Sequence, residues 1–198
     1  MRPLLIVISA PSGAGKSTLC DRLLAERSDI VYSISCTTRK PRGDEAHGVA
    51  YFFLTEQQFD ADVKAGRFLE HAVVHGNKYG TPRSMVADAM HSGKSVIMDI
   101  DVQGARQIRN YTKSLPDGDL LKSGYVDIFI SPPSMRVLRE RLEKRGEDAP
   151  EEIKRRLKNA GVEMNGRNEY LYVIVNDDLD RAYEELKKVL INEAEEKN

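Results

Sequence analysis

The sequence predicts an α/β protein in which a parallel sheet is flanked by helices. Two observations indicate this fold. Apolar runs rich in β-branched residues alternate along the chain with segments whose apolar residues have helical spacing. The first apolar run, residues 4–9, leads through a glycine-rich stretch into a helical pattern. At 198 residues the chain is long enough to bury a core as one domain.

The elements follow in order from these patterns. Strands are expected near residues 4–9, 31–35, 49–54, 68–74, 95–100, 125–130 and 171–175. Helices are expected near residues 17–27, 55–66, 82–92, 102–111, 133–145, 150–165 and 178–195. A capping box starting at Thr55 opens one helix, and Pro132-Pro133 suits the first turn of another. The polar stretch 110–124 is expected to be a surface loop.

Two regions differ from this regular alternation. Residues 35–94 combine short aromatic strands with turn signals, which predicts a small mixed α/β insertion that holds a second ligand. Residues 136–164 are mostly charged, with a glycine and a proline in the middle, which predicts two helices forming a mobile lid. The remaining residues, about 1–34, 95–135 and 165–198, are expected to form the core of a single domain.

The composition excludes several classes of partner. The 30 basic and 31 acidic residues give a net charge of −1, so no overall field favours nucleic acid or a membrane surface, and neither is expected as a partner. No apolar stretch approaches 18 residues. Cys20 and Cys36 have neither metal-ligand spacing nor a disulfide framework, so we expect reduced thiols and a cytoplasmic location.

The glycine-rich stretch predicts a phosphate-binding loop. It follows the pattern G-x-x-x-x-G-K-[ST] except that alanine stands first. Backbone N–H groups of such a loop surround an anion at a helix N-terminus, while the lysine reaches the β- and γ-phosphates and the hydroxyl lies near Mg²⁺. The alternative is an ordinary glycine-rich turn. The residues expected to bind a nucleoside triphosphate are Ala10, Pro11, Ser12, Gly13, Ala14, Gly15, Lys16, Ser17 and Thr18.

Two acids follow the strand at 95–100. Asp99 and Asp101 are two residues apart, so we expect them to project to the same side of that strand. An acid at the carboxyl end of a strand beside a phosphate loop is placed to hold Mg²⁺, and Asp99 is the candidate. The alternative is an exposed strand end with two solvated acids.

The predicted insertion carries two candidate sites. Arg39 and Arg42, with Tyr51 downstream, suggest a clamp for a second phosphate, whereas the alternative is a solvated basic loop. Glu70 lies between apolar residues, with Tyr79 and Thr81 beyond a turn. A carboxylate beside a hydroxyl suits a base that presents two donors on one edge, as guanine does, unless Glu70 is merely a surface acid.

The predicted lid and the last strand add four candidates. Arg141, Arg145 and Arg156 could close over a transferring phosphoryl group, or they could belong to a charged solvated helix face. Asn176 follows the last strand. It could contact an adenine edge or cap the last helix.

Seven segments together resemble the guanylate kinase family. They run in order from about residue 4 to 190 and read SAPSGAGKST, SISCTTRKPRGDEAHGVAYFF, FLEHAVVHGNKYGT, MDIDVQGA, ISPPS, RLEKRGED and VIVNDDLD. The resemblance implies a P-loop kinase core, a GMP-binding insertion and a helical lid. It also implies the Mg²⁺-dependent reaction of ATP and GMP to ADP and GDP in purine nucleotide metabolism. The chain departs from the family between about Arg109 and Tyr125, where it is longer.

The resemblance also implies roles for individual residues. Lys16 and its loop would hold the ATP phosphates, with Asn176 beside the adenine. The GMP phosphate would be held by Arg39, Arg42, Tyr51 and Tyr79. Guanine would be read by Ser35, Glu70, Thr81 and Asp101. The transferring group would be stabilised by Arg141, Arg145 and Arg156.

Two other functions fit parts of the pattern. Guanylate kinase-like modules of scaffold proteins bind peptides without catalysis, but such a module does not need Lys16, Ser17 and the lid arginines. A kinase for AMP or a pyrimidine nucleotide would not need the acids Glu70 and Asp101, which suit the two donors of guanine.

Overall fold

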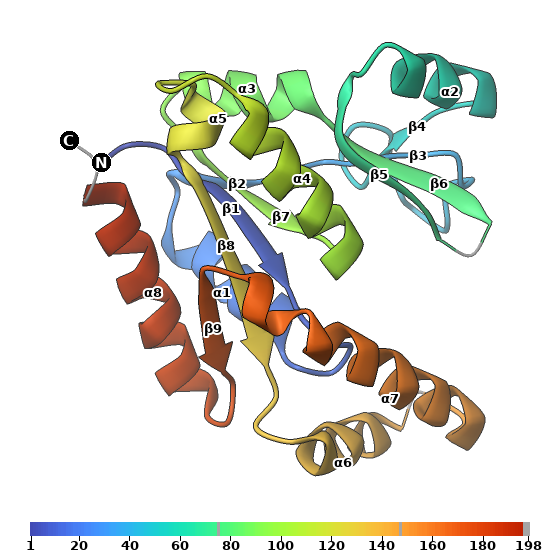
Figure 1. Cartoon of the computed structure of the whole chain (residues 1–198). Helices are drawn as coiled ribbons and strands as arrows, with labels where there is room; N and C mark the ends of the chain where they lie inside the picture. The colour runs from blue at the N-terminus through green and yellow to red at the C-terminus, as the bar shows by residue number, and fades with distance from the viewer. Residues whose placement is uncertain (75, 147, 196–198) are drawn as a thin grey trace.

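The computed structural model describes residues 1–74, 76–146 and 148–195 and contains two sheets with helices around them (Figure 1). The strands are β1 (Leu5–Ser9), β2 (Ile30–Tyr32), β3 (Cys36–Thr37), β4 (Phe52–Phe53), β5 (Phe68–Val74), β6 (Asn77–Pro82), β7 (Ser95–Asp99), β8 (Tyr125–Ser131) and β9 (Tyr172–Val175). The helices are α1 (Lys16–Glu26), α2 (Glu56–Lys64), α3 (Arg83–His91), α4 (Val102–Ser114), α5 (Leu120–Ser123), α6 (Met135–Arg145), α7 (Pro150–Asn165), the short 3₁₀ helix η1 (Arg167–Glu169) and α8 (Leu179–Glu195). The predicted α/β class is confirmed.

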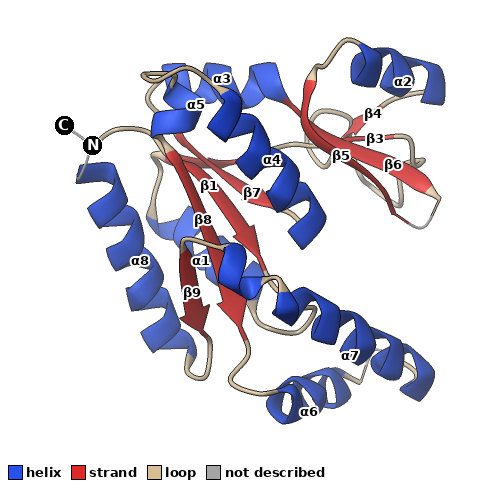
Figure 2. Ribbon diagram, in the orientation of Figure 1, coloured by secondary structure: helices blue, strands red, loops and turns tan. Residues whose placement is uncertain are grey.

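The main sheet is parallel and has the strand order β2-β7-β1-β8-β9 (Figure 2). All residues of β1 are buried, because helices cover both faces of the sheet. On one face Ile6 and Ile8 pack with residues of α1 and α8. On the other face Leu5 and Val7 pack with residues of α3 and α4. A strand buried on both faces reads as a continuous apolar run, which is why the sequence predicted β1.

The second sheet is mixed and has the strand order β4-β3-β6-β5. β3 pairs parallel with β4 and antiparallel with β6, and β6 also pairs antiparallel with β5. The expected strand at 49–54 is reduced to β4, and β6 lies where only turn signals were expected. The sequence NKYGTP has no alternation of apolar residues, so β6 is a strand because two neighbours supply its backbone hydrogen bonds.

The expected surface loop at 110–124 is wrong. α4 continues to Ser114, and α5 forms a further turn. Tyr111, Leu115 and Leu120 pack against the core cluster that contains the buried Leu121. The packing of these apolar side chains stabilises helical turns in this segment, although its proline and glycine had indicated a loop.

Two helix starts also differ from expectation. α1 begins at Lys16, directly after the glycine loop. α6 begins at Met135 and not in the proline pair, because Ser134 caps it by accepting a hydrogen bond from the Val137 N–H at 3.2 Å. The capping box at Thr55 is confirmed.

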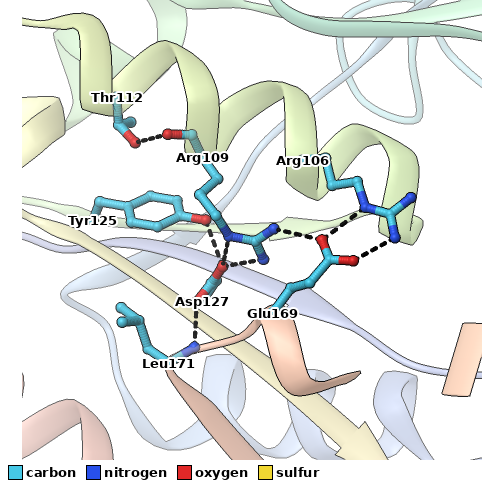
Figure 3. Close-up of polar contacts among 7 residues, drawn as sticks. All are labelled: Arg106, Arg109, Thr112, Tyr125, Asp127, Glu169 and Leu171. Atoms are coloured by element: carbon cyan, nitrogen blue, oxygen red, sulfur yellow. Dashed lines mark hydrogen bonds and ion pairs between the residues drawn. The ribbon is translucent and has the colours of Figure 1, made fainter. Parts of the chain in front are cut away.

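A buried charged network joins α4 to the main sheet (Figure 3). Asp127 of β8 is fully buried and accepts hydrogen bonds from Arg109, from the Tyr125 hydroxyl at 2.7 Å and from the Leu171 N–H at 2.8 Å. Arg109 also contacts Glu169 of η1, which accepts a hydrogen bond from Arg106 at 2.7 Å. The network therefore fixes α4 relative to both β8 and the segment that follows α7.

We expect Asp127→Asn to lower the free energy of unfolding by about 3 kcal/mol, because it leaves the Arg109 guanidinium without its buried counter-charge. Urea denaturation measures the change. Asp117→Asn is the matched control: its partner is Lys122 at 2.8 Å, but its side chain is 99% exposed, and exposed pairs contribute about 0–1 kcal/mol. Equal effects of the two substitutions would contradict a stabilising role for the buried network.

Candidate functional site

The loop between β1 and α1 has the backbone of a phosphate-binding turn. Gly13 and Gly15 have φ angles of 89° and 94°, which residues with a side chain rarely adopt. The Ala14 N–H donates to the Pro11 carbonyl at 3.0 Å and closes the turn. α1 starts at Lys16, so its free N–H groups and its partial positive charge face the loop. Ala10 at the first motif position leaves this turn intact.

Asn176 holds the loop from the opposite end of the chain. Its side-chain amide donates to the Ala14 carbonyl at 2.7 Å, and its own N–H donates to the Ser131 carbonyl at 2.8 Å. Asn176 does not cap the last helix, because Asp178 does so by accepting from the Arg181 N–H at 2.9 Å. The capping alternative is therefore wrong.

Two clefts open beside the glycine loop, and the second of them lies beside Asn176. It has a volume of about 350 Å³. Its lining comes from the glycine loop, α1, α6, the β9–α8 connection and the start of α8: Gly13, Gly15, Thr18, Arg141, Lys144, Arg145, Asn176 and Leu179.

The first cleft, which we call the loop cleft, has a volume of about 390 Å³ and lies over the loop. Lys16 forms an ion pair with Asp99 inside it. Its walls bring together the loop, residues 99–101 after β7, and two residues of the predicted lid. The lining residues are Ala10, Pro11, Ser12, Gly13, Gly15, Lys16, Ser17, Thr18, Asp99, Ile100, Asp101, Arg145 and Glu163.

The expectation that Asp99 and Asp101 project from one strand is wrong. β7 ends at Asp99, and Asp101 is the N-cap of α4, where its carboxylate accepts from the Gly104 N–H at 2.8 Å. The chain turns between the two acids, yet both still line the same cleft. Asp101 thus belongs both to the cleft and to the first turn of α4.

Glu163 also lines this cleft, although the sequence did not single it out. Burial raises the pKa of its carboxyl, the charge of Lys16 lowers it, and the charge of Asp101 raises it. A single glutamate in a helix as charged as α7 carries no signal that could have marked it.

The candidate phosphate clamp is built on Arg39, which is only 8% exposed. Its guanidinium donates to Glu45 at 2.9 Å and lies 5.3 Å from the ring centre of Tyr51, which in turn contacts the Tyr79 ring edge-on at 5.9 Å. Glu45, not singled out from the sequence, also accepts from the Arg42 N–H at 2.8 Å. Hydrogen bonding by Arg39 holds the pKa of Glu45 below its usual value.

The candidate base site is centred on Glu70 of β5. Glu70 is 7% exposed and accepts a hydrogen bond from the Thr81 hydroxyl at 2.7 Å, and the Thr81 and Ser35 hydroxyls are 3.3 Å apart. Burial raises the pKa of the Glu70 carboxyl, and the hydrogen bond from Thr81 partly opposes this. Glu70 is therefore a buried carboxylate with hydroxyl neighbours and not a surface acid.

Arginines of the α6–α7 hairpin bond to the glycine loop and to Asn176 beside it. Arg156 donates to the Ser12 hydroxyl at 2.9 Å and pairs with Asp148 at 3.1 Å. Arg141 donates to the Asn176 carbonyl at 2.8 Å. The hairpin also packs on the loop, since a Cβ added to Gly13 would lie 3.0 Å from Cδ2 of Leu142.

A glycine loop at the carboxyl edge of a parallel sheet, with an acidic strand end beside it and a second polar site on a separate sheet, defines the class of P-loop kinases. The guanylate kinase family profile matches residues 2–193. Guanylate kinase from Clostridium perfringens (strain 13 / Type A) is 45% identical over 192 residues, which cover 97% of this chain and 84% of that protein. Guanylate kinase from Ruegeria pomeroyi is 47% identical over 189 residues, which cover 96% of this chain and 85% of that protein.

A solved structure gives the same answer. The crystal structure of guanylate kinase from Anaplasma phagocytophilum matches with a TM-score of 0.71 at 33% identity, covering 98% of this chain and 87% of that one. The chain belongs to the guanylate kinase family. Among the described residues, no helix is both long and apolar enough to cross a membrane.

We expect Gly15→Ala to weaken ATP binding at least tenfold, because a left-handed backbone with a side chain costs about 1–3 kcal/mol and the new Cβ would overlap Nδ2 of Asn176. Calorimetric titration with ATP measures the affinity. Gly161→Ala is the control, since Gly161 is in α7 with open space around its added Cβ. Unchanged ATP affinity in Gly15→Ala would show that the loop does not need this backbone conformation.

Proposed function

We propose that the two sites described above hold the two substrates of one reaction, with the triphosphate on the glycine loop and the monophosphate on the mixed sheet. As a member of the guanylate kinase family, the chain transfers a phosphoryl group from ATP to GMP and forms ADP and GDP. The observation that supports the assignment best is that both sites meet at the first turn of α4. There Asp101 lines the loop cleft, and Gly104 lies against Glu70.

In this proposal the transfer is direct and in line. The acceptor is already a phosphate oxygen anion, so the reaction needs neither a covalent intermediate nor a strong general base. Catalysis then consists of positioning and of neutralising charge. Lys16 and the loop N–H groups bind the ATP phosphates, and Arg141, Arg145 and Arg156 stabilise the transferring group. Lys16 is paired with Asp99 in the cleft, and Arg156 donates a hydrogen bond to Ser12 of the loop.

The monophosphate site divides into two parts. Arg39, Arg42, Tyr51 and Tyr79 bind the GMP phosphate; Glu45 orients the Arg39 guanidinium and also accepts from the backbone N–H of Arg42. Glu70 and Asp101 accept hydrogen bonds from the guanine N1–H and N2 amine, with Ser35 and Thr81 beside them. On the ATP side, Asn176 lies by the adenine at the edge of the second cleft.

The residues present fit a magnesium ion. Ser17 and Asp99 place a hydroxyl and a carboxylate oxygen in the same cleft as Lys16, and Mg²⁺ prefers oxygen ligands. Bound with ATP, the ion would neutralise charge on the phosphates.

We assign the parts of the chain accordingly. Residues 35–82 form the GMP-binding insertion, residues 136–164 the lid, and the remaining residues the core of the single domain. The separate mixed sheet, which ends at Pro82, and the separate apolar cluster of α6 and α7 support this division. The expected end of the insertion at residue 94 is too late, because Val86 and Met90 of α3 pack against the main sheet. A cytoplasmic location and the absence of nucleic-acid and membrane partners stay predictions.

We expect Lys16→Ala to lower kcat at least ~10³-fold through lost charge stabilisation. GMP binding should persist, because the residues assigned to GMP lie mainly on the mixed sheet. A coupled assay of ADP release measures kcat, and calorimetry measures GMP affinity. Lys188→Ala, on the exposed side of α8, is the control. Near-normal turnover of Lys16→Ala would contradict the assignment of the loop.

We expect Glu70→Gln to reduce kcat/KM for GMP sharply while the KM for ATP changes little. The substitution keeps the shape of the side chain but replaces an acceptor by an amide donor, and a mispaired buried group costs about 1–3 kcal/mol. ADP release measured with GMP, IMP and AMP tests this, with Glu185→Gln on α8 as the control. An unchanged ratio of GMP to AMP would show that Glu70 does not read the base.

A further inference from the structure

We propose that Gln107 is a positioning residue that sets the spacing between Glu70 and Asp101 and thereby the selectivity for guanine. The inference rests on the proposed function, in which these two acids read the base. It concerns a residue that contacts neither the loop cleft nor the described parts of the phosphate clamp.

The Gln107 side chain binds the backbone next to Glu70. Its Oε1 accepts from the His71 N–H at 3.1 Å, and its Nε2 donates to the His71 carbonyl at 3.0 Å. β5 is the last strand in the order of the mixed sheet as described, so His71 presents this pair of backbone groups away from β6. The glutamine amide therefore pairs with β5 as a residue of a neighbouring strand would, and it does so from α4.

The other end of the connection is the first turn of α4. Asp101 caps this helix by accepting from the Gly104 N–H at 2.8 Å. A Cβ added to Gly104 would lie 3.2 Å from Oε2 of Glu70 and 3.5 Å from Oδ1 of Asp101. Gly104 thus lies between the two acids, and Gln107 follows three residues later on the same side of the helix. Glu70, His71, Gln107, Gly104 and Asp101 form one continuous set of contacts.

This connection matters because the two acids lie on different parts of the fold. Glu70 is on the mixed sheet, whereas Asp101 is fixed to the main sheet through α4 and the Arg109–Asp127 contact (Figure 3). A base that donates to both acids requires each donor–acceptor distance to fall within about 2.7–3.2 Å. The paired hydrogen bonds of Gln107 hold β5 at the distance from α4 that meets both requirements.

Gln107→Met tests the inference, because methionine has nearly the same length but cannot form either hydrogen bond. We expect kcat/KM for GMP to fall about tenfold, as the loss of two hydrogen bonds predicts. IMP lacks the N2 amine and binds fewer of the paired acceptors, so its kcat/KM should fall less than threefold. The GMP-to-IMP ratio therefore drops, while the KM for ATP stays within twofold. Asn110→Met, at an exposed position of α4, is the matched control.

The ratio separates positioning from a general effect on folding. A merely structural role lowers the activity toward GMP and IMP equally, and an unchanged ratio in Gln107→Met would overturn the inference while leaving the proposed function standing. If the wild type itself does not prefer GMP to IMP, the proposed guanine site fails and the inference fails with it. Should Gln107→Met not fold, Gln107→Glu provides the same comparison, since it keeps the acceptor and replaces the donor to the His71 carbonyl.

Discussion

The pairing of β1 with β7 and β8 is the constraint on which the rest of the molecule depends. Leu5 to Ile8 pair with Val96 to Asp99 on one side, and Leu5 to Ser9 pair with Tyr125 to Phe129 on the other. A shift of one residue would move every buried side chain of β1 to the opposite face of the sheet. This register places the glycine loop and Asp99 at the same edge. The Lys16–Asp99 pair follows from it.

α4 connects the two regions to which we assign the two ligands. Its first residues carry the Asp101 cap and the close approach of Gly104 to Glu70. Its middle contacts β5 through Gln107, and Arg106 and Arg109 bind Glu169 just after α7. A single helix, fixed at Asp127, thus contacts both the mixed sheet and η1, which follows the α6–α7 hairpin. A displacement of α4 would therefore change the positions of both the mixed sheet and η1.

Local patterns predicted the parts of the fold that are determined locally. The buried strands at 4–9, 95–100 and 125–130 and the charged hairpin follow from periodicity, and the resemblance to the guanylate kinase family is confirmed by the comparisons. β6 was not predicted, because its strand conformation depends on pairing with two other strands and not on a pattern of its own. The contact of Asn176 with Ala14 spans 162 residues, so no local pattern could reveal it. Asp101 was misplaced because a chain turn after Asp99 overrides strand alternation.

The α6–α7 hairpin has an apolar cluster of its own, formed by Leu138, Leu142, Ile153, Leu157 and Ala160. Because these side chains pack mainly against one another, a change in the angle of the hairpin would expose little apolar surface beyond the contact of Leu138 and Leu142 with Gly13. The free energy of such a movement would then depend mainly on charge, through arginines such as Arg156, which pairs with Asp148 and Glu152 and which we propose binds phosphate instead when the nucleotides are present. ATP with GMP and ADP with GDP carry the same number of phosphate groups. In the proposed arrangement, closure driven by charge would therefore hold substrates and products alike, which suits a reaction that runs in both directions.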